Sequence, residues 1–204
     1  MAPVKERRAR EKEQLRREIL DAARDLFVRE GYENVSMRRI AERIEYSPTT
    51  IYLYFQDKAE LLYCLCEETF ARLVKEFERL KAEDSGDPVR CLRRGMRAYI
   101  EFGLKYPNHY KVTFIMHPEH HEPDKYMNPD SMGMKAFAFL PALVGEAVRQ
   151  GKFRQVDVAA TSQTLWAAIH GLTSLLIVHP DFPWVNRSEL IDHLIDTMLD
   201  GLKA

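Results

Sequence analysis

The chain of 204 residues contains little cysteine, no long apolar run and almost no net charge. None of its apolar stretches approaches the ~20 residues that a membrane-spanning helix requires. The first 18 residues are highly charged and lack the apolar segment of a secretory signal. The three cysteines are an odd number without metal-binding spacing, which is typical of thiols in a reducing compartment. We therefore expect a cytoplasmic protein that has no membrane partner.

The sequence also lacks the patterns of enzymes and nucleotide-binding proteins. No nucleophile with a neighbouring base, no glycine-rich phosphate loop and no carboxylate pair stands out. The stretch HPEHH at 117–121 places three histidines beside acidic residues, but Pro118 interrupts the rigid helix that such metal ligands need. A solvated loop is the favoured interpretation, and we expect no catalysis, metal or cofactor. A metal-dependent enzyme that uses His117–His121 stays open as an alternative.

Charge is distributed unevenly along the chain. Residues 1–58 carry 13 Lys and Arg against 11 Asp and Glu, whereas residues 59–204 carry 17 against 20. This weak skew places a polyanion-binding surface at the N-terminal end.

Apolar residues recur every three or four positions through most of the chain, which predicts helices. The segments expected to be helical are 13–29, 37–44, 48–55, 58–81, 89–105, 108–116, 131–150, 157–179 and 188–202. Ser36, Ser47 and Asp57 have the side chains that cap helix N-termini, and Gly31 suits a helix C-terminus. Pro141 is expected to kink or divide its helix, and 117–130 to form a loop. Without strand alternation or repeats, the fold class is all-α with about nine helices.

The two short helices at 37–44 and 48–55, joined by Glu45-Tyr46-Ser47, form a helix-turn-helix. A helix fits the major groove of B-form DNA, where its first residues reach base edges. The second helix begins SPTTIYLYF, whose hydroxyl groups can bond bases or phosphates.

Residues 19–62 resemble the N-terminal domain of the tetracycline-repressor (TetR) family over about 45 residues. The residues that carry the resemblance are Gly31-Tyr32, Ser36, Ile40-Ala41, Ser47-Pro48, Thr50, Tyr52, Tyr54-Phe55, Lys58 and Leu61. Glu45 departs from the pattern, because many members have glycine in this turn. The resemblance implies a three-helix DNA-binding domain at residues 1–57 and a ligand-sensing, dimerising helical domain at 58–204.

The resemblance also implies the residues that contact DNA. It places base contacts at Thr49, Thr50 and Leu53. Tyr52, Tyr54 and Lys58 match positions that contact phosphates or the edge of the groove, and Arg38 matches a position that can contact a guanine. Ser47 and Pro48 start the reading helix. As alternatives, Tyr52 packs beneath the first helix and Lys58 is a solvated first-turn residue. Arg7, Arg8, Arg10 and Lys12 form either an arm in the minor groove or a frayed, solvated helix, because glutamates alternate with them.

The C-terminal part resembles the Trp-His-Gly class of TetR-type domains, through Trp166, His170-Gly171, Gly151-Lys152-Phe153 and Pro107–Phe114. This implies a ligand cavity and a dimer interface. The aromatic and apolar side chains expected to line the cavity are Phe102, Tyr106, Tyr110, Phe114, Phe137, Leu140, Trp166 and His170. The alternative is that they only fill the core. The expected interface residues are Leu165, Leu172, Leu175, Leu176, Leu194 and Met198, on helices with more apolar faces than one core covers.

We therefore predict a homodimeric repressor that leaves a quasi-palindromic DNA operator when a small hydrophobic effector binds. A ligand-independent architectural DNA-binding protein is the main alternative.

Overall fold

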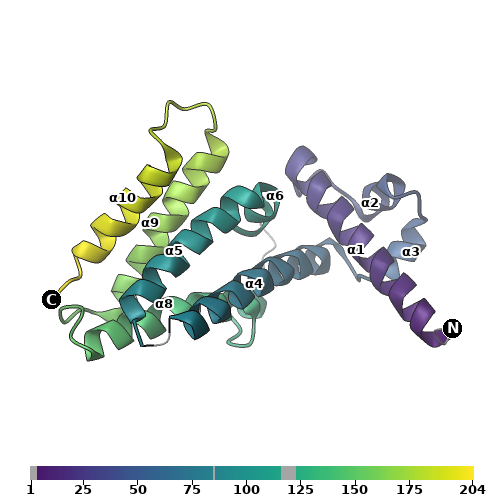
Figure 1. Ribbon diagram of the computed structural model, residues 1–204. Coiled ribbons are helices and arrows are strands. Elements are labelled where there is room, and N and C mark those ends of the chain that lie inside the picture. The colour runs from purple at the N-terminus through teal and green to yellow at the C-terminus, as the bar shows by residue number, and fades with distance from the viewer. Residues whose placement is uncertain (1–3, 85, 116–122) are drawn as a thin grey trace. The chain divides into compact units, whose positions relative to one another are not determined.

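A computed structural model describes residues 4–84, 86–115 and 123–204 (Figure 1). The expected all-α class is confirmed, because these residues form ten α-helices and a short π-helix, and no β-strand occurs among them. The helices are α1 (Val4–Glu30), α2 (Met37–Arg43), α3 (Pro48–Tyr52), α4 (Lys58–Glu83), α5 (Pro88–Lys105), α6 (Pro107–Tyr110), the π-helix η1 (Lys111–Ile115), α7 (Pro123–Tyr126), α8 (Met132–Arg149), α9 (Val158–Val178) and α10 (Arg187–Asp200).

The chain forms two compact units that share α4. Where described, the first comprises Met1–Thr69 and Asn108–Pro123, and the second comprises Phe70–Pro107 and Asp124–Ala204. The backbone therefore passes from one unit to the other inside α4, again at the start of α6, and a third time between Pro123 and Asp124 in α7. The functional division expected between residues 57 and 58 concerns roles in binding, and it stays a prediction.

Local hydrogen bonds explain where several helices begin. Ser36 accepts a hydrogen bond from the Arg39 amide at 3.1 Å and caps α2. Asp57 accepts from the Glu60 amide at 2.7 Å, and the Glu60 carboxylate accepts from the Gln56 amide at 2.6 Å. This reciprocal pair fixes the start of α4 as a capping box does.

Several helix boundaries differ from the expected ones. Helix α3 ends at Tyr52 instead of residue 55, and the helix expected at 108–116 is divided into α6 and η1. Helix α1 begins at Val4 instead of residue 13, and its additional turns contain the i,i+4 ion pair of Arg7 with Glu11, which favours helix. Pro141 does not divide α8, which continues through it to Arg149. The short helix α7 lies inside the stretch expected to be a loop. The histidines of 117–121 lie outside the described residues.

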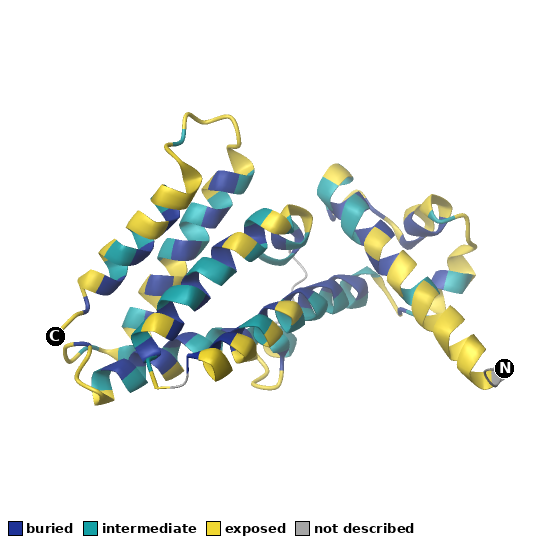
Figure 2. Ribbon diagram, in the orientation of Figure 1, coloured by how far each residue is buried: buried dark blue, intermediate teal, exposed yellow. Residues whose placement is uncertain are grey.

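The core of the first unit joins α1, α2, α3 and the first half of α4. Figure 2 shows the buried stripe of α1 alternating with exposed turns. The largest fully buried side chains of the first unit include Phe27, Ile40, Ile51, Phe55, Leu61 and Tyr110. Because Ile51 and Phe55 are buried beside α2, the short helix α3 is held by packing and not by its own length.

In the second unit, α5 packs against α8, α9 and α10. Gly95 permits the close approach of α8, because a Cβ there would lie 2.3 Å from the ring of Phe139. Phe139 in turn stacks on Phe77 of α4 with ring centroids 4.3 Å apart. Ion pairs of Arg93 and Arg97 with Asp196 and Asp192 join α5 to α10.

In the part of the chain that the structure describes, every helix is too short or too polar to cross a lipid bilayer.

Candidate nucleic-acid interface

The turn between α2 and α3 is compact because Glu45 adopts a left-handed backbone conformation with φ of 61°. The Tyr46 amide then donates to the Ala41 carbonyl at 3.0 Å and closes the end of α2. Glycine adopts this conformation without steric cost, which explains why a glycine suits the turn, whereas Glu45 adopts it at a steric cost.

The start of α3 is held by Ser47 and Pro48. The Ser47 hydroxyl accepts from the Thr50 amide at 3.2 Å and lies 2.9 Å from the Thr50 hydroxyl. Pro48 occupies the first helical turn, where a missing amide hydrogen costs nothing. Two of the residues expected to bind DNA are thus the pair that shapes the helix, and Thr50 shares its hydroxyl with the cap.

The outward face of α3 carries side chains that lack a packing role in the unit. Tyr52 is 54% exposed and Leu53 is 75% exposed, and Thr49 is exposed beside them. Tyr52 therefore does not pack beneath α2, which was the alternative. Tyr46, 44% exposed in the preceding turn, joins this surface. Sequence reasoning missed it because it treated the turn only as a connection.

Arg38 and Lys58 differ in their freedom to reach a ligand. The Arg38 side chain is 80% exposed and pairs with Glu42 in the same helix at 3.1 Å. Lys58 is half-buried: its ammonium donates to the Tyr32 carbonyl at 2.7 Å and lies 4.1 Å from the centre of the Tyr32 ring. Lys58 thus fastens α4 to the segment after α1, and its ammonium keeps donors for a second acceptor.

A salt bridge fixes the far side of the helix-turn-helix. Arg39 of α2 pairs with Glu30 of α1 at 2.9 Å. These hydrogen bonds lower the pKa of the Glu30 carboxyl below its ordinary value. The pair therefore stays ionised at neutral pH and orients α2 on α1.

The residues expected to line a ligand cavity fall in both units. Tyr110 and Phe114 belong to the first, with ring centroids 4.7 Å apart. The residues in the second unit are Phe102, Tyr106, Phe137, Leu140, Trp166 and His170.

In the second unit the aromatic residues of α5, α8 and α9 form ring contacts. Phe102 and Tyr106 lie 5.3 Å apart, and Trp166 lies 5.8 Å from Phe137 and 5.9 Å from His170.

A hydrogen-bonded group joins α5 to α9 at the same place. The Tyr99 hydroxyl accepts from the Trp166 indole at 3.4 Å and lies 3.3 Å from Nδ1 of His170. Nε2 of His170 lies 3.4 Å from the Ser174 hydroxyl. Tyr99 was missed in the sequence, although it stands three residues before Phe102 and so shares a face of α5 with it.

A cavity of about 550 Å³ in the second unit lies elsewhere, between the end of α4, the start of α5 and α8. None of the residues expected to bind ligand lines it. Its walls include Lys81, Asp84, Cys91, Pro141, Leu143 and Glu146. Asp84 is buried and pairs with Arg90 and Arg94, each at 2.7 Å, so its charge is already neutralised within the fold.

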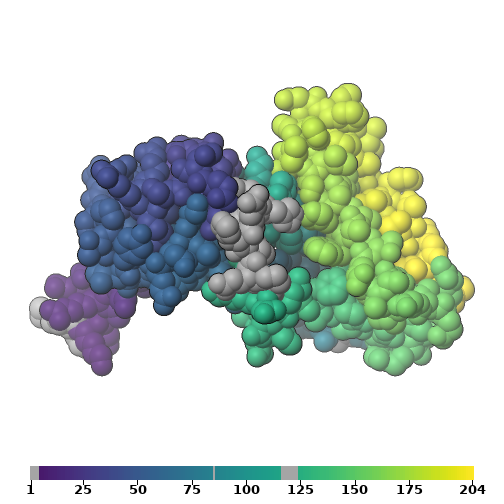
Figure 3. Space-filling model, turned by 180° about the vertical axis from the view of Figure 1, so that it is seen from behind, coloured from purple at the N-terminus to yellow at the C-terminus, as the bar shows by residue number. Residues whose placement is uncertain are grey.

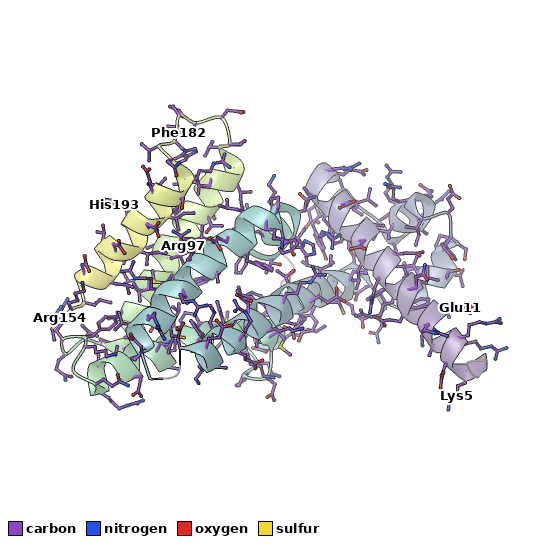
Figure 4. The ribbon with its side chains drawn as sticks, in the orientation of Figure 1. Lys5, Glu11, Arg97, Arg154, Phe182 and His193 are labelled. Atoms are coloured by element: carbon purple, nitrogen blue, oxygen red, sulfur yellow. The ribbon has the colours of Figure 1, made fainter. Side chains whose placement is uncertain are left out.

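The residues expected at a dimer interface separate into two groups. Leu165 and Leu176 are buried in the core of the second unit. Leu175 is exposed, and Leu172, Leu194 and Met198 are half-buried. The loop after α9 also exposes Phe182, which is labelled in Figure 4, and Val185. Apolar side chains therefore remain accessible along α9, α10 and the loop that joins them.

No group of three potential metal ligands occurs within residues 4–84, 86–115 and 123–204. Burial raises the pKa of the Cys64 thiol, so this thiol is neutral at neutral pH and a poor nucleophile.

Two sequence families match the chain. The family described as bacterial regulatory proteins, tetR family, matches residues 19–63. The tetracyclin repressor-like C-terminal domain matches residues 92–202. Together they cover the helix-turn-helix and nearly all of the second unit's described helices.

Known transcription regulators match either nearly the whole chain or about a third of it. The probable HTH-type regulator ArpR of Pseudomonas putida is 24% identical over 201 residues, which is 95% of this chain and 93% of the relative. The HTH-type repressor KstR of Rhodococcus jostii is 39% identical over 75 residues, which is 37% of this chain and 32% of that protein.

Solved structures share the fold. The TetR family regulator PfmR from Thermus thermophilus has a TM-score of 0.74 and 25% identity, covering 91% of this chain and 99% of that one. FadR from Bacillus subtilis, solved with stearoyl-CoA, has a TM-score of 0.78 and 18% identity, covering 91% and 98%.

The fold and the helix-turn-helix define a DNA-binding transcription regulator with a separate helical domain. The chain belongs to the TetR family of bacterial regulatory proteins.

Proposed function

We propose that a homodimer of this chain represses transcription by occupying a quasi-palindromic DNA operator, and that a small hydrophobic effector releases it. The observation that carries the proposal is the outward face of α3, where Thr49, Tyr52 and Leu53 are exposed on a helix held rigidly from behind. Such a regulator acts on chromosomal DNA, which in bacteria lies in the cytoplasm.

The first turn of α3 enters the major groove. Thr49 is exposed and offers a hydroxyl to base edges, whereas the Thr50 hydroxyl must leave Ser47 or share its hydrogen bond. Leu53 offers an apolar surface to a thymine methyl group. Phosphate contacts by Tyr52, Tyr54 and Lys58 set the position of the helix. Arg38 leaves its ion pair with Glu42 and binds a guanine.

Dimerisation places two such helices in successive major grooves, roughly 34 Å apart. The side chains that α9 and α10 leave accessible, Leu172, Leu175, Leu194 and Met198, support this interface. Because Leu165 and Leu176 are buried in the protomer, they contribute by fixing α9 and not by direct contact. A dimer that is obligate buries on the order of 2,000 Å² in total.

The effector binds beside the aromatic residues of α5, α8 and α9. Their ring contacts and the polar group of Tyr99, His170 and Ser174 provide an apolar surface with a few hydrogen-bonding atoms, as ligand sites do. The structure of FadR with stearoyl-CoA supports a ligand with an acyl chain. A ligand shifts operator affinity only if it prefers one conformer, with a coupling of roughly 1–3 kcal/mol.

The test begins with DNA fragments selected by the purified full chain from a random library. A palindromic consensus is expected, and light scattering should give a dimer at micromolar concentration. Operator affinity is then measured with stearoyl-CoA, stearate and a planar aromatic hydrocarbon. Release by one of them supports the full proposal, and binding that no ligand alters favours the architectural alternative. Failure to enrich any sequence would overturn operator recognition.

A further inference from the structure

The N-terminal half of α1 carries a stripe of basic residues that the helix-turn-helix does not use. Helix α1 begins at Val4, and its first turns are exposed and extend beyond α2 and α3 (Figures 1 and 3). With 3.6 residues per turn, Lys5, Arg8 and Lys12 project within roughly 60° of one another around the helix. We name these three residues the basic stripe.

The charges of the basic stripe are not neutralised by neighbours. Within the described part of the chain, none of the three residues takes part in an ion pair. Glu11, three residues after Arg8, pairs with Arg7 at 3.5 Å instead. Farther along α1, Arg17 pairs with Glu13 at 3.0 Å. The glutamates therefore compensate arginines on other faces of the helix and leave the stripe with a charge of its own.

The stripe faces the same side as the end of the reading helix. The Lys12 ammonium lies 6.0 Å from the ring centre of Tyr54, two residues after α3 ends. One turn farther, on the same face, the Arg16 guanidinium lies 5.4 Å from the ring of Phe55 and pairs with Glu68 of α4 at 2.8 Å. These contacts fix the rotation of α1, so the residues preceding them continue outward from the surface that carries Tyr52 and Tyr54.

The stripe has dimensions suited to a DNA backbone. Lys5 and Lys12 are seven residues apart, or roughly 10 Å along a helix, which corresponds to about three base pairs of duplex. Figure 4 labels Lys5 and Glu11 on these free turns of α1. Cations in a row, without base-reading partners around them, match the regular negative charge of phosphates.

We propose that Lys5, Arg8 and Lys12 bind the phosphate backbone of duplex DNA flanking the bases that α3 reads. This inference rests on the proposed operator binding. It assigns α1 a role of its own: the stripe adds affinity that depends on the length of the flank and not on its sequence. Because α1 is helical from Val4, Arg7 and Arg10 do not form the extended arm considered as an alternative, and with Arg17 they project from other faces of the helix and contribute little to this affinity.

The experiment compares two full-length variants that lose equal charge. Lys5→Gln/Arg8→Gln/Lys12→Gln removes the stripe, and Arg7→Gln/Arg10→Gln/Arg17→Gln is the matched control. Glutamine has a helix propensity close to those of lysine and arginine, and circular dichroism checks that α1 is retained. Each protein is titrated with the selected operator carrying either no flank or ten additional base pairs on each side, over a range of salt concentrations.

The parent and the control are expected to bind the flanked operator more tightly than the short one, and the stripe variant to lose this gain. Each phosphate contact that is removed makes the slope of log K against log [salt] shallower by about 0.9. The affinity lost at 0.1 M salt should therefore exceed the affinity lost at 1 M salt by about eightfold per contact. Equal affinities and slopes for the stripe variant and the control on flanked DNA would overturn the inference, while operator binding by the parent would still stand. Absence of operator binding by the parent would instead refute the proposed function. If a triple variant loses helicity, Lys12→Gln against Arg17→Gln gives the same comparison.

Discussion

Glu45 shows how one residue sets the geometry of the turn before α3. The positive φ destabilises the folded state by roughly 1–2 kcal/mol for an L-residue. A glycine would remove this strain, but it would lose more conformational entropy on folding, which offsets part of the gain. Glu45→Gly is therefore expected to raise the free energy of unfolding by about 1 kcal/mol, measured by urea denaturation. Glu42→Gly, inside α2, is the control and should lower it by a similar amount. Destabilisation by both variants would contradict strain at Glu45.

Tyr52 tests the outward face of α3 without disturbing the fold. Tyr52→Phe removes one hydroxyl from a side chain that is exposed, so thermal stability should not change. If that hydroxyl bonds a phosphate, operator affinity should fall by about tenfold, the equivalent of about 1.4 kcal/mol. Tyr63→Phe, on α4 of the same unit, is the matched control and should bind as the parent does. Unchanged affinity in Tyr52→Phe would remove Tyr52 from the contacts.

At the scale of helices, the close packing of α5 on α8 depends on Gly95. An added Cβ would lie 2.3 Å from a Phe139 ring that is itself stacked on Phe77 and so cannot retreat freely. Gly95→Ala is expected to lower stability by about 1 kcal/mol, because overpacking of about 2 kcal/mol exceeds the helix propensity gained. Thermal melting should show Gly145→Ala, whose Cβ meets only Val158 at 4.0 Å, moving the other way. Adding Phe139→Leu to Gly95→Ala should recover part of the loss. A melting temperature for Gly95→Ala at or above that of the parent would contradict this account.

The helices could be predicted from the sequence where an apolar period and a cap coincide, as at Ser36, Ser47 and Asp57. The first turns of α1 could not, because their charges have no apolar period and so fit a frayed segment equally well. Nor could the sequence show that Lys58 bonds the Tyr32 carbonyl, since that contact joins residues 26 positions apart. The Tyr99–His170 contact spans 71 positions and was missed for the same reason. The apolar pattern of a sequence predicts which face of a helix is buried, whereas contacts between residues far apart in the sequence depend on how the helices pack.

For the whole molecule, the backbone crosses between the two compact units three times, and each crossing is a covalent connection between them. One connection is α4, a helix of 26 residues or roughly 39 Å, the second is the chain at Pro107 and Asn108, and the third lies between Pro123 and Asp124 in α7. A single connection would leave the units free to swivel, whereas each further connection removes degrees of freedom. Tyr110 and Val112, which are buried in the first unit, anchor the chain after the second crossing.

An insertion can test whether the rotation between the two halves of α4 affects DNA binding. One alanine inserted after Thr69 turns the two halves of α4 by roughly 100° against each other, while the other two connections keep their lengths. A single operator half-site should still be bound, since the first unit is intact. Affinity for the full palindrome should fall by at least about tenfold, because the two copies of α3 in the proposed dimer lose their spacing. Equal loss on the half-site and the palindrome would mean that the insertion had damaged the head itself. In the proposed dimer, the rotation between the two halves of α4 would therefore determine whether the two copies of α3 match successive major grooves.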